Sequence, residues 1–298
     1  MNPPTQQIVS HPDGSVEVLA PAKLNLTLSV RPEPRPDGFH EIESLFVGID
    51  FYDRLMFQPP KGFPSAPEPA LTVRGLDAPC DETNLVFQAA KLLAEHVGRP
   101  CNVSIHLEKH IPAGRGLGGG SSDAAATLLG LNHLWNLELS RDELAALGAR
   151  LGSDVPFFFY LPAAECRGRG ERVEPVNVEK IFAVLVIPDF AISTPSVYKI
   201  FDELTAEGKM DTLTPSSGMG LMPTTPKNQL EPAAMRAEPR LAEVRQKVKE
   251  LGLGENLHLT GSGSAMFALC EPEQARQAAE KINNRTPWQA RVVETCSC

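Results

Sequence analysis

The stretch IPAGRGLGGGSSDAA, residues 111–125, places five glycines and two serines directly before a segment with helical character. A helix begins with free backbone N–H groups and a partial positive charge. A glycine loop in front of it lets phosphate oxygens approach the backbone, because no Cβ stands in the way. The hydroxyls of Ser121 and Ser122 can contact phosphate or a bound Mg²⁺. We therefore predict a polyphosphate-binding loop rather than a flexible linker.

Other phosphate-binding patterns fit this stretch less well. Gly114, Gly116 and Gly119 satisfy GxGxxG, but a dinucleotide-binding fold needs a strand after the helix, ending in an acidic residue about 20 positions on. A second helix is expected instead, and Glu138 lies in the turn between the two helices. The P-loop pattern fails because no lysine follows Gly120, and the HRD and DFG motifs of protein kinases are absent.

A lysine and an aspartate elsewhere in the chain carry side chains suited to acid–base chemistry. Lys23 shares one face of a predicted strand with Asn25 and Thr27, while the leucines of that strand point the other way. Asp154 follows a Gly-Ser turn and precedes the apolar run Val-Pro-Phe-Phe-Phe. Such a carboxylate is either a helix cap or a functional acid. A lysine on a solvated sheet face is equally ordinary, so the residues alone leave both roles open.

The elements that must position these groups follow from apolar periodicity and capping signals. Thr83 is expected to cap a helix, and Ser140 with Glu143 forms a capping-box pattern. Residues 58–70 and 206–227 should be irregular. Strands are expected at 16–30, 42–57, 102–109, 181–187, 257–260, 265–270 and 288–294, and helices at 81–97, 121–136, 141–151, 238–251 and 272–283. The division expected is an extension at 1–17 and domains at 18–170 and 171–298.

Composition narrows the class of protein. A net charge of −9 leaves no basic surplus for nucleic acid. The longest apolar run, residues 155–161, is too short to span a bilayer, and the first 15 residues lack the pattern of a signal peptide. The six cysteines and seven histidines show no metal-binding spacing. We expect a cytoplasmic protein with reduced thiols and no nucleic-acid or membrane partner.

Three motifs together resemble a known superfamily. PAGRGLGGGSSDAA (112–125), APAKLNL (20–26) and LTGSGSAMFAL (259–269) are similar, in order and spacing, to motifs of the small-molecule kinases that include galactokinase, homoserine kinase and mevalonate kinase. The resemblance covers nearly the whole chain after about residue 18. It implies an α+β fold of two domains, a ribosomal-S5-like domain followed by a ferredoxin-like domain, with a cleft for ATP and Mg²⁺.

Within that superfamily, PDGFHEIESLF (36–46), GSDVPFF (152–158) and TPSVY (194–198) resemble the 4-diphosphocytidyl-2-C-methyl-D-erythritol kinases. The resemblance implies ATP-dependent phosphorylation of the 2-hydroxyl of that cytidine diphosphate substrate, in the non-mevalonate route to isoprenoids, by a monomer or weak homodimer. The alternatives are another kinase of the superfamily, for mevalonate or a sugar, and a non-catalytic ligand-sensing regulator. Retention of the glycine loop, Lys23 and Asp154 argues against a regulator.

The same resemblance assigns roles to individual residues. Lys23 and Asp154 would be catalytic, with Asp154 accepting the proton of the hydroxyl and Lys23 steadying the developing charge. ATP would be bound by Lys109, Pro112, Ala113, Gly114, Arg115, Gly116, Leu117, Gly118, Gly119, Gly120, Ser121 and Ser122, with Ser121 also a Mg²⁺ ligand. The substrate would be bound by Asn25, Phe39, His40, Pro195, Tyr198, Gly261, Ser262 and Gly263.

Two positions depart from the commoner family residues. Phe39 stands where tyrosine is commoner. With Tyr198 it would sandwich the cytosine, whose edge His40 would read, and stacking survives the loss of a hydroxyl. Arg115 stands where glycine is commoner, and its guanidinium could add a cation near the phosphates.

Overall fold

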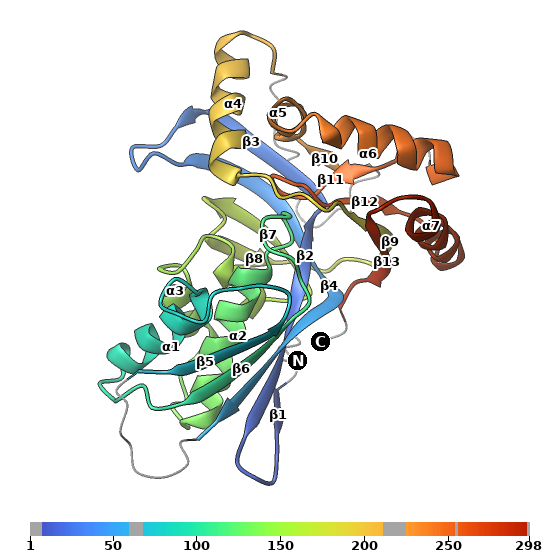
Figure 1. Ribbon diagram of the computed structural model, residues 1–298. Coiled ribbons are helices and arrows are strands. Elements are labelled where there is room, and N and C mark those ends of the chain that lie inside the picture. The colour runs from blue at the N-terminus through green and yellow to red at the C-terminus, as the bar shows by residue number, and fades with distance from the viewer. Residues whose placement is uncertain (1–7, 60–67, 211–224, 254–255, 297–298) are drawn as a thin grey trace.

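The computed structural model describes residues 8–59, 68–210, 225–253 and 256–296, which form two sheets with helices packed around them (Figure 1). The strands of the first sheet are β1 (Ile8–Ser10), β2 (Val16–Asn25), β3 (Thr27–Pro34), β4 (His40–Gln58), β5 (Ala70–Gly75), β6 (Ser104–Lys109), β7 (Ala163–Gly168), β8 (Arg172–Pro175) and β10 (Lys227–Asn228). The central pair consists of β2 and the long β4, which run antiparallel from Val16 opposite Phe57 to Asn25 opposite Phe46.

The register of this central ladder shifts between Pro21 and Ala22. A bulge of this kind bends a strand and redirects its side chains, and bulges are common beside active sites. Here the shift comes directly before Lys23, so the last part of β2 turns toward the second half of the molecule while its first part stays paired with the end of β4.

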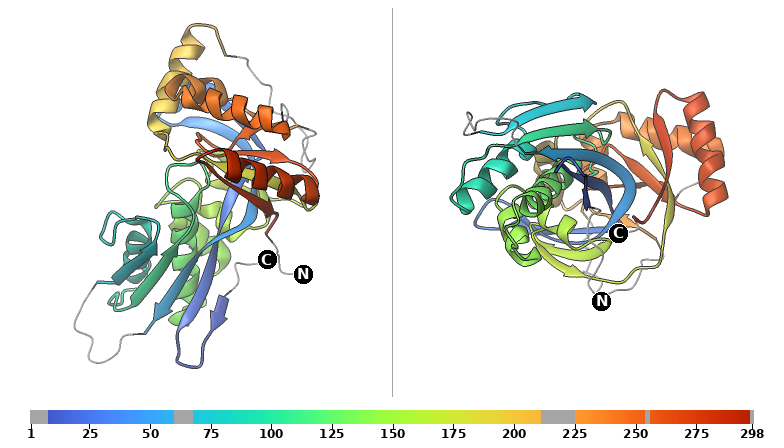
Figure 2. Two further views of the ribbon diagram at one scale, coloured as in Figure 1. Left: turned by 45° about the vertical axis from the view of Figure 1, so that its right-hand side comes forward. Right: turned by 90° about the horizontal axis from the view of Figure 1, so that it is seen from below.

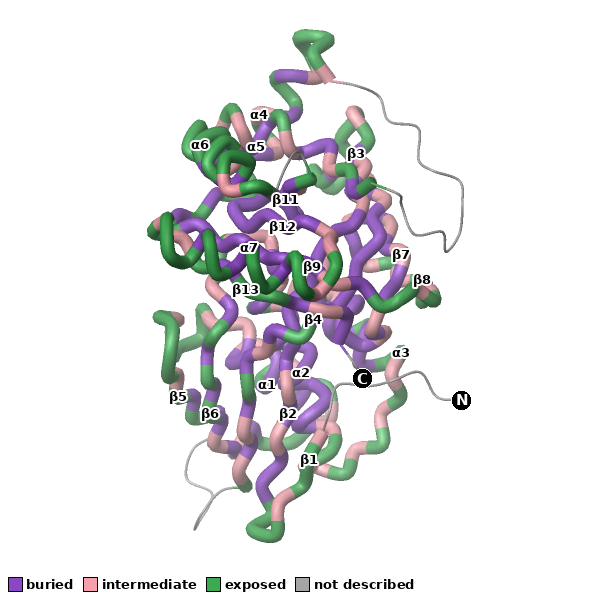
Figure 3. Tube along the Cα trace, turned by 90° about the vertical axis from the view of Figure 1, so that its right-hand side faces the viewer, coloured by how far each residue is buried: buried purple, intermediate pink, exposed green. Residues whose placement is uncertain are grey.

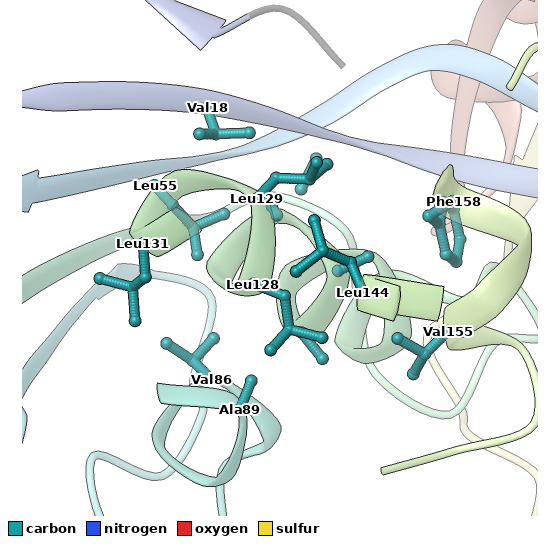
Figure 4. Packing of buried hydrophobic residues seen from close by; sticks show 14 of the residues in the cluster. Val18, Leu55, Val86, Ala89, Leu128, Leu129, Leu131, Leu144, Val155 and Phe158 are labelled. Carbon is teal, nitrogen blue, oxygen red and sulfur yellow. The ribbon is translucent and has the colours of Figure 1, made fainter. Parts of the chain in front are cut away.

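Helices α1 (Leu85–His96), α2 (Gly119–Leu134) and α3 (Arg141–Gly148) and the 3-10 helix η1 (Val155–Phe159) cover one face of the first sheet. Figure 4 shows Val86 and Ala89 of α1 beside Leu128 and Leu131 of α2. The Ser140–Glu143 capping box is confirmed at the start of α3. The cap of α1 is Asn84, not Thr83: the Asn84 side chain accepts the Val86 N–H, while Thr83 bonds Asp81.

The second sheet has the strand order β11 (His258–Leu259), β12 (Met266–Leu269), β9 (Phe182–Ile187), β13 (Gln289–Glu294). Its helices are α4 (Thr194–Ala206), α5 (Glu231–Ala237), α6 (Arg240–Val248), continued by the π-helix η2 (Lys249–Leu253), and α7 (Pro272–Arg285). Helices follow β9 and β12, and this alternation with the strand order 2-3-1-4 is that of a ferredoxin-like fold. The fold class predicted from the sequence is confirmed.

The two sheets share a buried core, which fixes one half of the molecule against the other. Leu24 of β2 and Leu26, which lies between β2 and β3, pack with Leu185 of β9 and Phe267 of β12, all fully buried. Alternate residues of β9, such as Val186, face the second core under α4, α6 and α7. Figure 2 shows the second sheet against the bent end of β2 and β4, and in Figure 3 these strands form the buried centre of the molecule.

Three observations bear on the expected organisation. Strand β8 pairs with β7 and so extends the first sheet beyond residue 170, and β1 brings part of the 1–17 segment into that sheet. Helix α4 occupies a segment for which the sequence indicated no element, while most of the 206–227 link lies outside the described residues. In the part of the chain that the structure describes, no helix is long and apolar enough to cross a membrane.

Candidate active site

A cleft of about 790 Å³ lies where the end of β2, the glycine loop and the start of α4 meet. It gathers most of the residues singled out in the sequence. Its walls include Lys23, Asn25, Phe39, His40, the continuous run Pro112–Ser121, Asp154, Pro195, Tyr198, Gly261 and Ser262. The predicted catalytic, nucleotide and substrate groups therefore share one cavity.

The glycine loop is held between the two halves by backbone hydrogen bonds. Lys23 N donates to the Leu117 carbonyl at 2.9 Å, and Ala265 N donates to the Arg115 carbonyl at 3.1 Å. Gly116 has φ +74°, and a Cβ there would lie 2.1 Å from the Thr260 carbonyl oxygen. Only glycine allows both this conformation and this approach, so the loop's shape is fixed by contacts that are independent of any ligand.

The loop ends in an open helix N-terminus. Gly118, in the left-handed conformation, is the N-cap of α2, and no side chain caps the helix. The first-turn N–H groups are therefore available to an anion, together with the helix dipole. Ser121 lines the cleft. Ser122 does not: it is fully buried, and its Oγ has no hydrogen-bond partner among the described residues.

Lys23 and Asp154 meet at the middle of the cleft. Lys23 Nζ donates to Asn25 Oδ1 at 2.5 Å and lies 3.5 Å from Asp154 Oδ2 and 4.6 Å from the centre of the Phe46 ring. Asn25 is in turn held by Ser44, whose Oγ accepts from Asn25 Nδ2 at 2.9 Å. The Lys23 side chain is 4% exposed and that of Asp154 30%. The ammonium is thus fixed, and the carboxylate remains open to a ligand.

Lys109 lies elsewhere than predicted. Its side chain is buried beneath the loop, where Nζ donates to Asp53 and, at 2.7 Å, to Asp123. Asp53 also accepts the N–H groups of His110 and Ile111. Burial alone would lower the pKa of Lys109, but the charges of Asp123 and Asp53 more than offset it and raise that pKa. With two carboxylates on its ammonium, Lys109 supports the loop from below instead of facing ATP.

The far end of the cleft is aromatic and cationic. Phe39 is 49% exposed, and the Arg169 guanidinium carbon lies 4.9 Å from its ring centre. The ring stacked on Tyr198 is that of His40, with centroids 5.6 Å apart and planes at 22°. Burial raises the pKa of Tyr198. Phe39 and Tyr198 thus line the same cleft, although the ring in contact with Tyr198 in this structure is His40.

The remaining predicted residues divide between lining and support. Ser262 lines the cleft, and its Oγ lies 2.7 Å from Oγ1 of Thr194, which also lines it. Gly263 is not among the lining residues; its N–H bonds the Thr260 carbonyl. The Arg115 guanidinium donates to the carbonyls of Pro188 and Ala113, at 3.2 and 3.3 Å, so these bonds anchor the loop.

Sequence reasoning missed several side chains of the cleft. Ser153, Lys199 and Asp202 line it. The spacing of Tyr198 and Asp202, four residues apart, would have placed both on one helix face, had a helix been recognised there. Among the described residues, no group of three or more His, Cys, Asp or Glu side chains is arranged to hold a metal ion.

The fold and this cleft define a GHMP kinase. The model of the GHMP kinase N-terminal domain matches residues 84–161, which contain the glycine loop and Asp154, and that of the GHMP kinase C-terminal domain matches residues 216–287. A crystal structure of homoserine kinase from Cytophaga hutchinsonii has a TM-score of 0.68 at 18% identity, covering 97% of this chain and 96% of that one, and so shares the fold.

Closer relatives narrow the class. The chain is 41% identical to 4-diphosphocytidyl-2-C-methyl-D-erythritol kinase of Thermus thermophilus, over 90% of this chain and 92% of that protein. It is 39% identical to the enzyme of the same name from Pelotomaculum thermopropionicum, over 94% and 98%. A crystal structure of 4-(cytidine 5'-diphospho)-2C-methyl-D-erythritol kinase matches at 38% identity with a TM-score of 0.71, over 94% and 100%. This chain belongs to the 4-diphosphocytidyl-2-C-methyl-D-erythritol kinase family.

Proposed function

We propose that this protein transfers the γ-phosphoryl group of ATP to the 2-hydroxyl of 4-diphosphocytidyl-2-C-methyl-D-erythritol, in the non-mevalonate route to isoprenoid precursors. The observation that carries the proposal is the order of groups along one cleft. An open helix N-terminus and glycine loop lie at one end, Lys23 and Asp154 at the middle, and the aromatic group of Phe39 and Tyr198 at the other.

ATP fits the glycine end of this cleft. The run Pro112–Ser121 lines it with backbone, and the first-turn N–H groups of α2 lack a side-chain cap. Phosphate oxygens are the anions that such a terminus favours. Ser121, with its hydroxyl on the cleft wall, would hold Mg²⁺ together with the phosphates, since Mg²⁺ sites commonly use few protein ligands. When bound, Mg²⁺ neutralises charge on the transferring phosphoryl group.

The chemistry falls to Lys23 and Asp154. A sugar hydroxyl is a weak nucleophile at neutral pH, and a positioned carboxylate speeds its attack by accepting the proton. Asp154 Oδ would take that proton as the oxygen–phosphorus bond forms and the bond to ADP breaks. Lys23, fixed 3.5 Å away by Asn25, would stabilise the negative charge that develops on the phosphoryl oxygens.

The cytidine diphosphate would extend from this centre toward α4. Phe39 and Tyr198 offer apolar faces for the cytosine. Arg169 and Lys199 line the same end. These two cations would face the diphosphate and neutralise its charge. The Lys23 ammonium, which already contacts Asn25 and Asp154, would then remain for the transferred phosphoryl group.

An ADP-release assay with a panel of acceptors tests the proposal. The cytidine diphosphate substrate should support turnover at a kcat/KM far above those for mevalonate, homoserine and galactose. Faster turnover of any of these three would contradict the assigned substrate. No ADP release with any acceptor, from protein that binds the cytidine compound by calorimetry, would favour the ligand-sensing regulator.

A further inference from the structure

The amide of Asn25 lies between the Lys23 ammonium and two buried hydroxyl groups. Its Oδ1 accepts from Lys23 Nζ at 2.5 Å and from the Thr260 hydroxyl at 3.3 Å, while its Nδ2 donates to Ser44 Oγ at 2.9 Å. Asn25 is 3% exposed, Ser44 1% and Thr260 0%. An amide carries its acceptor on one arm and its donors on the other. Only one of its two orientations therefore places an acceptor against the ammonium.

Ser44 fixes this orientation, because its one hydroxyl proton is used elsewhere. Ser44 Oγ donates to the carbonyl of Thr27. A carbonyl only accepts, so the proton lies in that bond and Ser44 Oγ is left as an acceptor toward Asn25. The arm of the amide that faces Ser44 is therefore the nitrogen. A turned amide would place Asn25 Oδ1 against an oxygen that has no proton to give, and an N–H₂ group against the Lys23 ammonium.

The backbone keeps Ser44 Oγ beside Thr27. Leu45 N donates to the Thr27 hydroxyl at 2.9 Å, and Leu26 N donates to the Leu45 carbonyl at 2.9 Å. These bonds join β4 to the bend between β2 and β3, next to Asn25 at the end of β2. The position of the Ser44 hydroxyl is thus set by the central strands of the first sheet.

The orientation of the amide decides where the Lys23 ammonium rests. Lys23 Nζ lies 3.5 Å from Asp154 Oδ2, beyond the usual length of a hydrogen bond. Asn25 Oδ1 thus holds the ammonium back from the carboxylate, which stays free to accept the proton of a substrate hydroxyl. With the amide turned, the ammonium would leave the N–H₂ group and move onto Asp154, where it would occupy the proposed base.

We infer that Ser44 is a positioning residue for phosphoryl transfer. By accepting from Asn25 Nδ2 it keeps Oδ1 on Lys23, and so keeps the ammonium apart from Asp154. Ser44 itself does not line the cleft, and its effect on the reaction passes through Asn25. The inference rests on the proposed function, because it requires Lys23 and Asp154 to act in the transfer of the phosphoryl group.

Ser44→Ala tests the inference by removing the acceptor of Asn25 Nδ2. With ATP and the cytidine diphosphate substrate, kcat should fall by about 10- to 100-fold, the effect of one hydrogen bond to a charged group. The KM values for both substrates should stay close to those of the wild type, the pattern of an interaction that matters in the transition state. Ser44→Thr keeps the hydroxyl and should retain most of kcat. An equal loss in folded Ser44→Thr would place the cause in packing and overturn the inference.

Thr127→Val is the control for the loss of a buried hydroxyl. Thr127 is 0% exposed, its Oγ1 donates to the Asp123 carbonyl at 2.7 Å, and it does not line the cleft. Both Ser44→Ala and Thr127→Val should lower the thermal transition, because each leaves a buried polar group without its partner. Only Ser44→Ala should lower kcat. Loss of stability in both variants, with kcat unchanged in both, would mean that Ser44 is structural and would overturn the inference.

The double variant shows whether Ser44 acts through Lys23. Adding Ser44→Ala to Lys23→Ala should reduce the residual turnover little further, because groups that act as a unit lose their effects together. A second loss as large as that of Ser44→Ala alone would contradict the inference.

A failure of the proposed function has a separate signature. If the folded wild-type protein releases no ADP with the cytidine diphosphate substrate, the proposed function is wrong and the inference falls with it. If the wild type turns this substrate over and folded Ser44→Ala keeps the kcat of Thr127→Val, the inference alone is wrong.

Discussion

Two buried lysines flank the start of α2, and they differ in what surrounds their ammonium groups. Lys109 donates to Asp53 and Asp123, whose side chains are 0% and 3% exposed. Lys23 has the Asn25 amide and the carboxylate of Asp154, which is 30% exposed. The lysine side chains are equally buried, at 5% and 4%. The accessibility of the partner carboxylate, rather than that of the lysine, distinguishes a structural cluster from a reactive one.

The two clusters also differ in charge balance. Around Lys109 two acidic side chains share one ammonium in a closed space, so removing the lysine would leave a buried charge uncompensated. Near Lys23 the carboxylate of Asp154 is partly exposed, so a bound ligand can contact both the carboxylate and the ammonium. Adjacent glycines mark the boundary: a Cβ on Gly118 would lie 3.0 Å from Lys23 Cγ, and one on Gly119 would lie 3.0 Å from Lys109 Nζ.

The largest expected effect is on the open cluster. Asp154→Asn keeps size but cannot accept a proton, so kcat should fall by about 10²- to 10⁴-fold, the range of general base catalysis. The thermal transition and the affinity for substrate should change little. Lys23→Ala should also lower kcat, and the double variant should lose much less than the product of the single losses, because the pair acts as a unit. A kcat for Asp154→Asn within a few-fold of the wild type would mean that Asp154 only orients the substrate.

The closed cluster should respond in stability instead. Lys109→Met removes the cation shared by Asp53 and Asp123 and should lower the free energy of unfolding by about 3–5 kcal/mol, the cost of leaving a buried charge unpaired. Urea titration measures the change. Lys91→Met is the control: its exposed pair with Glu68 should contribute less than about 1 kcal/mol. An equally small effect for Lys109→Met would show that the cluster is not structural.

Substitutions at the neighbouring Gly119 and Gly120 test where the closed cluster ends and the ligand-binding cleft begins. A Cβ on Gly119 would meet Ile111 Cγ2 at 2.8 Å, whereas one on Gly120 would meet only Leu85, at an ordinary 3.6 Å. Gly119→Val should therefore destabilise the fold by about 1–3 kcal/mol through overpacking. Gly120→Val should keep the fold and weaken ATP binding by about tenfold or more, since it blocks a charge-assisted hydrogen bond. Unchanged ATP affinity of folded Gly120→Val, by calorimetry, would contradict the phosphate assignment.

At the cytidine end, the test concerns a single exposed ring. Phe39→Ala should raise the KM for the cytidine substrate by about 10- to 100-fold, from a stacking contribution of about 1–3 kcal/mol. Phe39→Tyr should be nearly silent, because the stacking face is retained. Equal KM values for Phe39→Ala and the wild type would remove the ring from the binding site.

The last expected effect is a change in the slope of stability with pH. Burial, together with the charge of Asp53, raises the pKa of Asp123 from 3.8 to about 8. The folded state then holds a proton that the unfolded state releases, so the contribution of Asp123 to stability is greatest below pH 4 and is lost as the pH rises toward 8. Asp123→Asn should remove this loss, at most about 1.4 kcal/mol per pH unit. Parallel stability curves for variant and wild type would contradict the shift.

The sequence predicted those parts of the site whose residues follow one another in the chain. The glycine loop, the Ser140 capping box and the strand carrying Lys23 each have a local pattern, and all lie where expected. Lys109 was placed wrongly because its partner Asp53 is 56 positions away in the chain, with no local mark of the pairing. Asp202 of the cleft wall was missed because its helix, α4, was not recognised.

The short strand β10 lies beside β3 in the first sheet although the residues that follow it build the second half of the molecule. Lys227 N and Gln229 N donate to the carbonyls of Leu26 and Leu28, and Asn228 Nδ2 donates to the carbonyl of Gly261 beside the cleft. This return of the chain ties the second half to the first sheet, so the halves cannot separate without breaking these hydrogen bonds. Evolution could then exchange the substrate by altering α4 and the β3–β4 turn alone, because the distance between nucleotide and acceptor is set by the interlocked scaffold.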